Sequence, residues 1–253
     1  MNKLKTLVAG IALAFSAGVA NAAIDDGSAG PGELFLNVWN QAAGETFTLD
    51  TGWSYDAFVA NPTSFTANFG ADPNWANFAA TGNNLMFSLG AKTNVDNGNA
   101  GRAYYVISVE TANPNFGVEN TSINVRGQMG LRVQDINAKA GSLDVADDLS
   151  TFSLAGQQGD YPNFWGSNVN NFATYDTDTE VGQWLAMYEV WTTGSRASTA
   201  VNNRLLGYAF LDKDLGTLSF ASEPPSAVPV PPALWLMGSA MTALVGFSRR
   251  RHA

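Results

Sequence analysis

Residues 34–50 read LFLNVWNQAAGETFTLD, and this stretch decides the fold class. In its first six residues, aliphatic side chains at positions 34, 36 and 38 alternate with two aromatic rings and an amide. Side chains alternate in this way between the two faces of a strand. A second run, 46–50, follows after Ala43-Gly44, which is the spacing of a hairpin. The stretch therefore predicts two antiparallel strands.

Five further runs are short, rich in aromatic or β-branched residues and bounded by turn residues, as strands are. These runs are 85–89, 104–109, 184–191, 204–211 and 218–220. No long helices alternate with them, so βαβ units are not indicated. The pattern predicts a mainly β domain, an antiparallel and jelly-roll-like β-sandwich with one or two short helical insertions.

Two segments carry helix signals. Asp72-Pro73 is a typical helix start, and the helix it begins carries Trp75 and Phe78. The second helix is predicted from apolar residues at helical steps of three or four, and Gly141 sits where a C-cap belongs. Gly127 and Gly130 weaken this second prediction, because glycine disfavours helix by up to about 1 kcal/mol relative to alanine. The apolar residues are Val125, Met129, Val133, Ile136 and Ala140.

The composition excludes several function classes. The 253-residue chain has no Cys, one His and a formal net charge of −9. Without Cys there is no disulfide framework, thiolate metal site or Cys nucleophile. The acidic balance argues against a nucleic acid partner, which requires basic patches.

The N-terminus reads as a secretory signal over residues 1–22. Lys3 and Lys5 form a positive region, and the apolar run 7–19 follows. Ala20 and Ala22 place small residues at the −3 and −1 positions of a signal-peptidase cut. We therefore expect export, with signal peptidase as the first partner.

The C-terminus carries a second apolar run, 228–248, whose 21 residues include no charge. That length is enough for a membrane span, although a helix beginning at Pro232 lies near the lower limit of about 17–25 residues. Arg249, Arg250 and Arg251 follow at once and stay cytoplasmic by the positive-inside rule. Both ends thus predict that the body lies on the far side of the inner membrane.

This tail resembles the PEP-CTERM sorting signal in its VPxPA-type variant, over about the last 26 residues. The resemblance is carried by a proline motif, a short apolar helix and an arginine cluster in that order. The motif residues are Val228, Pro229, Val230, Pro231 and Pro232. Val230 stands where the namesake motif has Glu, and Pro232 where the variant has Ala.

The resemblance implies transient insertion in the inner membrane, recognition by an exosortase and cleavage at or near the proline motif. It further implies release or surface attachment outside a Gram-negative cell, in company with exopolysaccharide. An ordinary C-terminal membrane anchor is the alternative, which length and charge alone do not separate from a sorting signal.

Removing both ends changes the chemistry of what remains. The body keeps all 22 acidic residues and only eight of the basic residues, so its formal charge is −14. It also loses His252, the only histidine, so neither a Ser-His-Asp constellation nor a His-ligated zinc site can form. The predicted organisation is a signal peptide 1–22, a β-sandwich domain 23–220, a linker 221–227 and a sorting signal 228–253.

Two candidate sites lie close together in the sequence. Asp176, Asp178 and Glu180 alternate, so an extended chain points three carboxylates to one face, where Ca²⁺ can bind through oxygen ligands. The alternative is a solvated strand edge that deters aggregation. This is the only cofactor or metal the sequence suggests.

The preceding segment, 156–175, sets aromatic rings among amides, glycines and a proline. Tyr161, Phe164 and Trp165 can offer stacking faces to a sugar, because long ordered loops are often functional. Alternatively, the rings fold back and plug the end of the sandwich.

Three functions remain open at this point. The first is a non-enzymatic surface or matrix protein with a structural or adhesive role near exopolysaccharide. The second is a carbohydrate-binding module that uses the loop aromatics. The third is a glycosidase or lyase with two carboxylates, for which Glu110 and Glu189 on predicted strands are candidates. No residue is predicted to be catalytic under the first two.

Overall fold

The computed structural model describes residues 24–80, 82, 85–93, 104–110, 114–117, 119–139, 150–160, 179–192 and 201–224. The chain divides into two units between Ser222 and Glu223, inside the predicted linker. All helices and strands of the described residues lie in the first unit.

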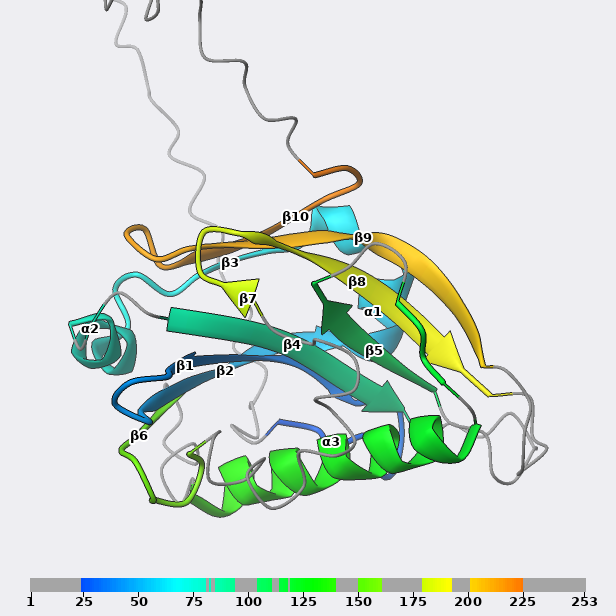
Figure 1. Ribbon diagram of the computed structural model, residues 1–253, viewed down its shortest axis with the longest axis horizontal. Coiled ribbons are helices and arrows are strands. Elements are labelled where there is room, and N and C mark those ends of the chain that lie inside the picture. Colours follow the sequence, from blue (N-terminus) through cyan, green and yellow to red (C-terminus); the bar gives the residue numbers. More distant parts are fainter. Residues whose placement is uncertain are drawn as a thin grey trace, which may run out of the picture. The chain divides into compact units, whose positions relative to one another are not determined.

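Ten strands among the described residues form one antiparallel sheet (Figure 1). Their order is β3-β10-β9-β8-β5-β4-β1-β2-β6, with β7 paired to β4 beside this path. The mainly β, antiparallel prediction is confirmed, and every predicted run lies in a strand. The strands are β1 (Glu33–Asn40), β2 (Thr46–Ser54), β3 (Thr66–Asn68), β4 (Leu85–Thr93), β5 (Tyr104–Val109), β6 (Ser150–Ser153), β7 (Thr179–Glu180), β8 (Trp184–Trp191), β9 (Asn202–Asp212) and β10 (Thr217–Ala221).

The sheet curls, so that its two halves enclose the main core (Figure 1). Leu36 of β1 and Phe47 of β2 belong to the same buried cluster as Met187 of β8 and Phe220 of β10. Burying apolar side chains from both halves on one another is the dominant force for this curvature. Because β4 and β5 join the halves, the strands form one sheet, and the two-sheet sandwich is not confirmed.

Two short helices complete this core. Helix α1 (Tyr55–Ala60) contributes Phe58, and α2 (Pro73–Ala79) contributes Trp75 and Phe78. The Asp72 carboxylate accepts hydrogen bonds from the backbone N–H groups of Asn74 and Trp75, at 2.7 and 3.3 Å. This N-cap, with Pro73 in the first turn, confirms the helix start predicted from sequence.

The longest helix, α3 (Glu119–Lys139), packs against the other face of the sheet (Figure 1). Val125, Met129, Val133 and Ile136 are each at most 1% exposed, which confirms the predicted apolar stripe. The last predicted members of the pattern, at 140 and 141, lie outside the described residues.

Gly130 has a packing reason to be in this helix. A Cβ built there lies 2.5 Å from Nζ of Lys92, a buried side chain of β4. Glycine at position 130 lowers the helix propensity, but the absence of a Cβ there leaves space for the end of the Lys92 side chain. A short connecting 3-10 turn, η1 (Pro62–Ser64), completes the helical elements of the described residues.

A buried arginine fixes α3 to the sheet. Arg132 is 0% exposed, and its guanidinium donates to Asn37 Oδ1 of β1 at 3.0 Å and to the Gly159 carbonyl at 2.9 Å. Its Nη1 lies 3.3 Å from Oδ2 of Asp135, which also accepts the Gly159 N–H. These contacts join the helix, the sheet and the turn before residue 161.

No helix within the described ranges is long and apolar enough to cross a membrane. The predicted signal peptide and the predicted span at 228–248 both lie outside those ranges.

We expect Arg132→Leu to lower the free energy of unfolding by about 3–5 kcal/mol, because it leaves buried acceptors without their donor. Urea unfolding of the purified protein measures this change. Gln134→Ala, on the exposed side of the same helix, is the matched control and should change stability by at most about 0.5 kcal/mol. Equal effects of the two substitutions would contradict the anchoring role of Arg132.

Asp50 of β2 gives the fold a pH dependence. Burial, with the nearby Glu33 carboxylate, raises its pKa from 3.8 to about 7. Between these values the folded protein keeps a proton that the unfolded chain has released, so Asp50 makes stability fall as pH rises from about 4 to about 7. We expect Asp50→Asn to remove this contribution.

The stability gained by Asp50→Asn over the unmodified protein should therefore grow with pH across this window, as followed by urea unfolding. Asp214→Asn, in an exposed turn, is the control. A stability difference for Asp50→Asn that does not vary with pH would show that the proton is not held in the fold.

Candidate functional site

The sheet splits where β4 and β5 part. Residues 90–93 of β4 pair with β5, whereas Met86 and Phe87 pair with β7. At the junction the Ser108 hydroxyl replaces the backbone ladder, since its Oγ accepts from the Leu89 N–H at 2.9 Å and donates to the Leu89 carbonyl at 3.3 Å. The short strand β7 enters the gap that this separation leaves.

The turn between β7 and β8 is held from both sides. The Val181 N–H donates to the Leu85 carbonyl of β4 at 2.8 Å, and the Gly182 N–H donates to the Leu211 carbonyl of β9 at 3.2 Å. Gly182 has φ of 95°, a conformation that glycine adopts without a Cβ penalty. The side chains that flank this turn are therefore presented from a fixed backbone.

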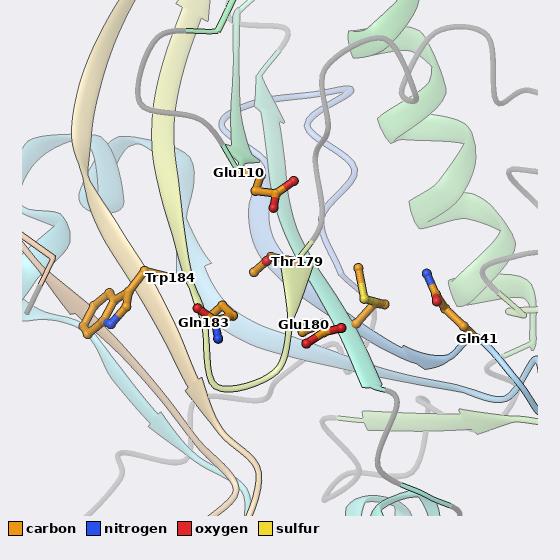
Figure 2. A pocket seen from close by; sticks show the side chains of 7 residues that line it. Gln41, Glu110, Thr179, Glu180, Gln183 and Trp184 are labelled. Carbon is orange, nitrogen blue, oxygen red and sulfur yellow. The ribbon is translucent and has the colours of Figure 1, made fainter. Parts of the chain in front are cut away.

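A pocket of about 610 Å³ opens at the split, within the usual size range of small-molecule sites. Figure 2 shows Glu110, Thr179, Glu180 and Gln183 around one opening, with Trp184 at its edge and the indole pointing away from these four side chains. The lining residues are Gln41, Met86, Glu110, Thr179, Glu180, Gln183 and Trp184. They come from the β1–β2 turn, β4, the end of β5, and the β7–β8 hairpin.

The polar side chains of this pocket are not used by the fold. Within the described part of the chain, none of its five polar lining side chains has a hydrogen-bond or ion-pair partner. Trp184 is half-buried and stacks on Phe210 of β9, with ring centroids 4.9 Å apart and an interplanar angle of 30°. The pocket thus offers unpaired donors and acceptors beside a fixed aromatic ring.

A second pocket, of about 470 Å³, lies beside α1. Unlike the first pocket, it is lined by polar side chains that bond to one another. Tyr55 donates its hydroxyl to Glu189 Oε1 at 2.8 Å, and Arg204 Nε contacts Glu189 Oε2 at 2.5 Å. Burial, followed by the negative charge of Glu189, raises the pKa of Tyr55. Because these groups satisfy one another, their arrangement ties α1 to β8 and β9.

The structure does not bring together the carboxylate pair considered for glycoside hydrolysis. Glu189 pairs across the sheet with Val106, and Glu110 lies four residues further along the chain, just after the end of β5. Four residues of strand span about 13 Å, beyond the roughly 5–9.5 Å that retaining and inverting glycosidases use. Glu110 and Glu189 also line different pockets.

Of the calcium candidates, Glu180 is described and exposed on β7, while Asp176 and Asp178 lie outside the described residues. No group of three or more acidic residues in the described ranges is placed to hold a metal ion. The calcium site therefore stays a prediction.

The remaining predicted site residues fall on parts of the chain that the structure does not describe. They are the loop aromatics Tyr161, Phe164 and Trp165, the signal residues Ala20 and Ala22, the motif residues Val228, Pro229, Val230, Pro231 and Pro232, and the cluster Arg249, Arg250 and Arg251.

Most of the pocket has no signal in the sequence. The sequence singles out Glu180 and Glu110 for other reasons and places Trp184 on a predicted strand, whereas it gives no reason to select Gln41 or Gln183. Gly182-Gln183 directly before a strand does indicate a hairpin turn. Nothing in the sequence places that turn beside the end of β5, which depends on the split of the sheet.

Comparison with protein-family models, with curated protein sequences and with solved structures finds no match to this chain. A function can therefore be inferred only from the geometry of the structure and from the sequences of the two termini.

The two pockets should respond differently to substitution. We expect Glu189→Ala to lower the free energy of unfolding by roughly 2 kcal/mol, since it leaves the buried Tyr55 hydroxyl without its acceptor. Glu110→Ala and Glu180→Ala remove carboxylates that the fold does not use, and should change stability by at most about 0.5 kcal/mol. Urea unfolding of the three variants tests the contrast, and equal losses would contradict it.

Proposed function

We propose that this protein is an exported cell-surface or extracellular-matrix protein, sorted by an exosortase, with a structural or adhesive role associated with exopolysaccharide. One observation carries the proposal. A proline motif, a short apolar run and an arginine cluster stand in this order at the C-terminus, and the same chain begins with a secretory signal sequence.

The proposed route has three steps. Signal peptidase removes residues 1–22, the apolar run 232–248 holds the precursor in the inner membrane, and the exosortase cuts at or near the proline motif. Supporting this route, the chain divides at Ser222, just before that motif. A cut after Ser222 leaves the folded unit with all of its strands and helices.

The body suits a role outside the cell that needs no redox or histidine chemistry. Its formal charge of −14 favours solubility and repels anionic surfaces. For its architecture we keep the jelly-roll-like sandwich as a proposal. Its support is that the two halves of the curled sheet share one apolar core.

Carbohydrate binding is the second candidate function, and it is favoured by the pocket at the split of the sheet. That pocket combines a fixed indole with polar side chains that the fold leaves unpaired. The predicted loop aromatics Tyr161, Phe164 and Trp165 remain a separate candidate surface for the same function. Neither surface requires catalysis.

Intact mass and cell fractionation of the native protein, with and without an active exosortase, test the sorting proposal. We expect a mature form that begins near Ala23, lacks the residues after the proline motif and lies outside the inner membrane. The joint substitution Pro229→Ala and Pro231→Ala should leave the C-terminus uncut. Pro224→Ala, in the linker before the motif, is the matched control.

An uncut C-terminus in the inner membrane of both strains would make the apolar run an ordinary anchor. The association with polysaccharide would then lose its support from the sequence.

A further inference from the structure

The strongest unassigned feature of the described residues is the pocket at the split of the sheet. Among the described residues, Arg132 is paired with Asn37 and Asp135, and Tyr55 with Glu189, whereas Glu45 Oε2 and Gln128 Oε1 are buried without a hydrogen-bond partner. The five polar side chains around this pocket come from three separate segments, and none of them has a hydrogen-bond or ion-pair partner among the described residues. Polar groups that converge on one opening beside an aromatic ring can fix the orientation of a bound ligand.

The charge of the lining selects the class of ligand. Glu110 and Glu180 are the only ionisable side chains among the seven lining residues. Two carboxylates on a body of strongly negative charge repel polyuronates, phosphates and other anions. The ligand that fits is therefore neutral or cationic.

The uncharged residues of the lining narrow the choice further. Gln41 and Gln183 each offer both a donor and an acceptor, and Thr179 adds a hydroxyl. The hydroxyl groups of a sugar likewise donate and accept, so they complement amides and carboxylates together. The indole of Trp184 supplies a large apolar face, and its packing on Phe210 keeps that face in a fixed orientation.

A metal ion alone is the weaker occupant. Calcium takes six to eight oxygen ligands, and no group of three or more acidic residues in the described ranges converges on one point. Nor does an ion need the indole at the side of the opening.

We propose that the pocket at the split of the sheet binds a neutral polysaccharide chain, with Trp184 packing against a sugar ring and Gln183, Glu180 and Glu110 bonding its hydroxyls. This inference rests on the proposed function for the biological source of the polymer. It assigns to that function a site separate from the predicted loop aromatics.

Affinity electrophoresis of the mature protein tests the proposal, with gels that contain a neutral glucan, mannan or galactan, and alginate as the anionic comparison. We expect retardation by at least one neutral polymer, none by alginate, and no change when EDTA is added. Absence of retardation by all three neutral polymers would overturn the proposal, as would retardation by alginate alone.

Variants locate the binding surface. Gln183→Ala, on an exposed turn, should weaken binding about fivefold through lost hydrogen bonds. Trp184→Ala should weaken it roughly 2- to 10-fold through the lost ring contact. The matched controls are Gln134→Ala on α3 and Trp191→Ala at the other end of β8, and both should bind normally.

Two outcomes count against this site. Normal binding by the Gln183 and Trp184 variants, with loss of binding in Trp165→Ala, would move the function to the loop aromatics. Retention of the fold in each variant is checked by urea unfolding. Binding that requires Ca²⁺ and is lost in Glu180→Gln would make the pocket a cation site instead.

Failure of this inference is distinguishable from failure of the proposed function. Intact mass and fractionation report on sorting without reference to the pocket, so a correctly sorted protein that binds no neutral polymer would remove only the binding site. A protein that binds the polymer but stays uncut in the inner membrane would remove only the sorting.

Discussion

The arrangement of the domain depends on the burial of one positive charge. Removing a guanidinium from water costs several kcal/mol unless partners replace the lost hydration. Arg132 finds those partners on β1, on its own helix and in the turn at Gly159. A second basic side chain of α3 also bonds to the sheet: Lys139 donates to the Phe152 carbonyl and the Ser153 hydroxyl of β6, each at 2.6 Å. Helix, sheet and turn must therefore assemble together.

The same sheet is interrupted in its middle, between β4 and β5, and this interruption has a different consequence. Ser108 bonds to the Leu89 backbone with its side chain, so β4 and β5 separate and β7 takes the place beside β4. The turn after β7 is then fixed by β4 and β9. Arg132 and Lys139 of α3 form hydrogen bonds that hold the fold together, whereas the polar side chains at the split have no partner among the described residues and are available to a ligand. This contrast is why we assign binding to the split.

Local patterns in the sequence predict the elements better than their arrangement. Alternation and turn residues give the hairpin of β1 and β2, and the Asp72-Pro73 signal gives α2, because each depends on neighbours in the chain. The stripe from Val125 to Ile136 predicts α3 but not its buried arginine, which would ordinarily be placed on the exposed face. Strand β7 has two residues, too few for any periodicity. The pocket escapes prediction because it joins four distant segments.

The central claim is that the split in the sheet forms a binding surface. A titration followed by backbone and indole amide NMR signals tests it most directly, using an oligosaccharide of the neutral polymer that retards the protein. The account predicts shifts confined to the Trp184 indole, residues 179–184, and the neighbourhood of Glu110 and Gln41. Shifts that spare these residues and appear around α1 or in the segment 161–178 would contradict it.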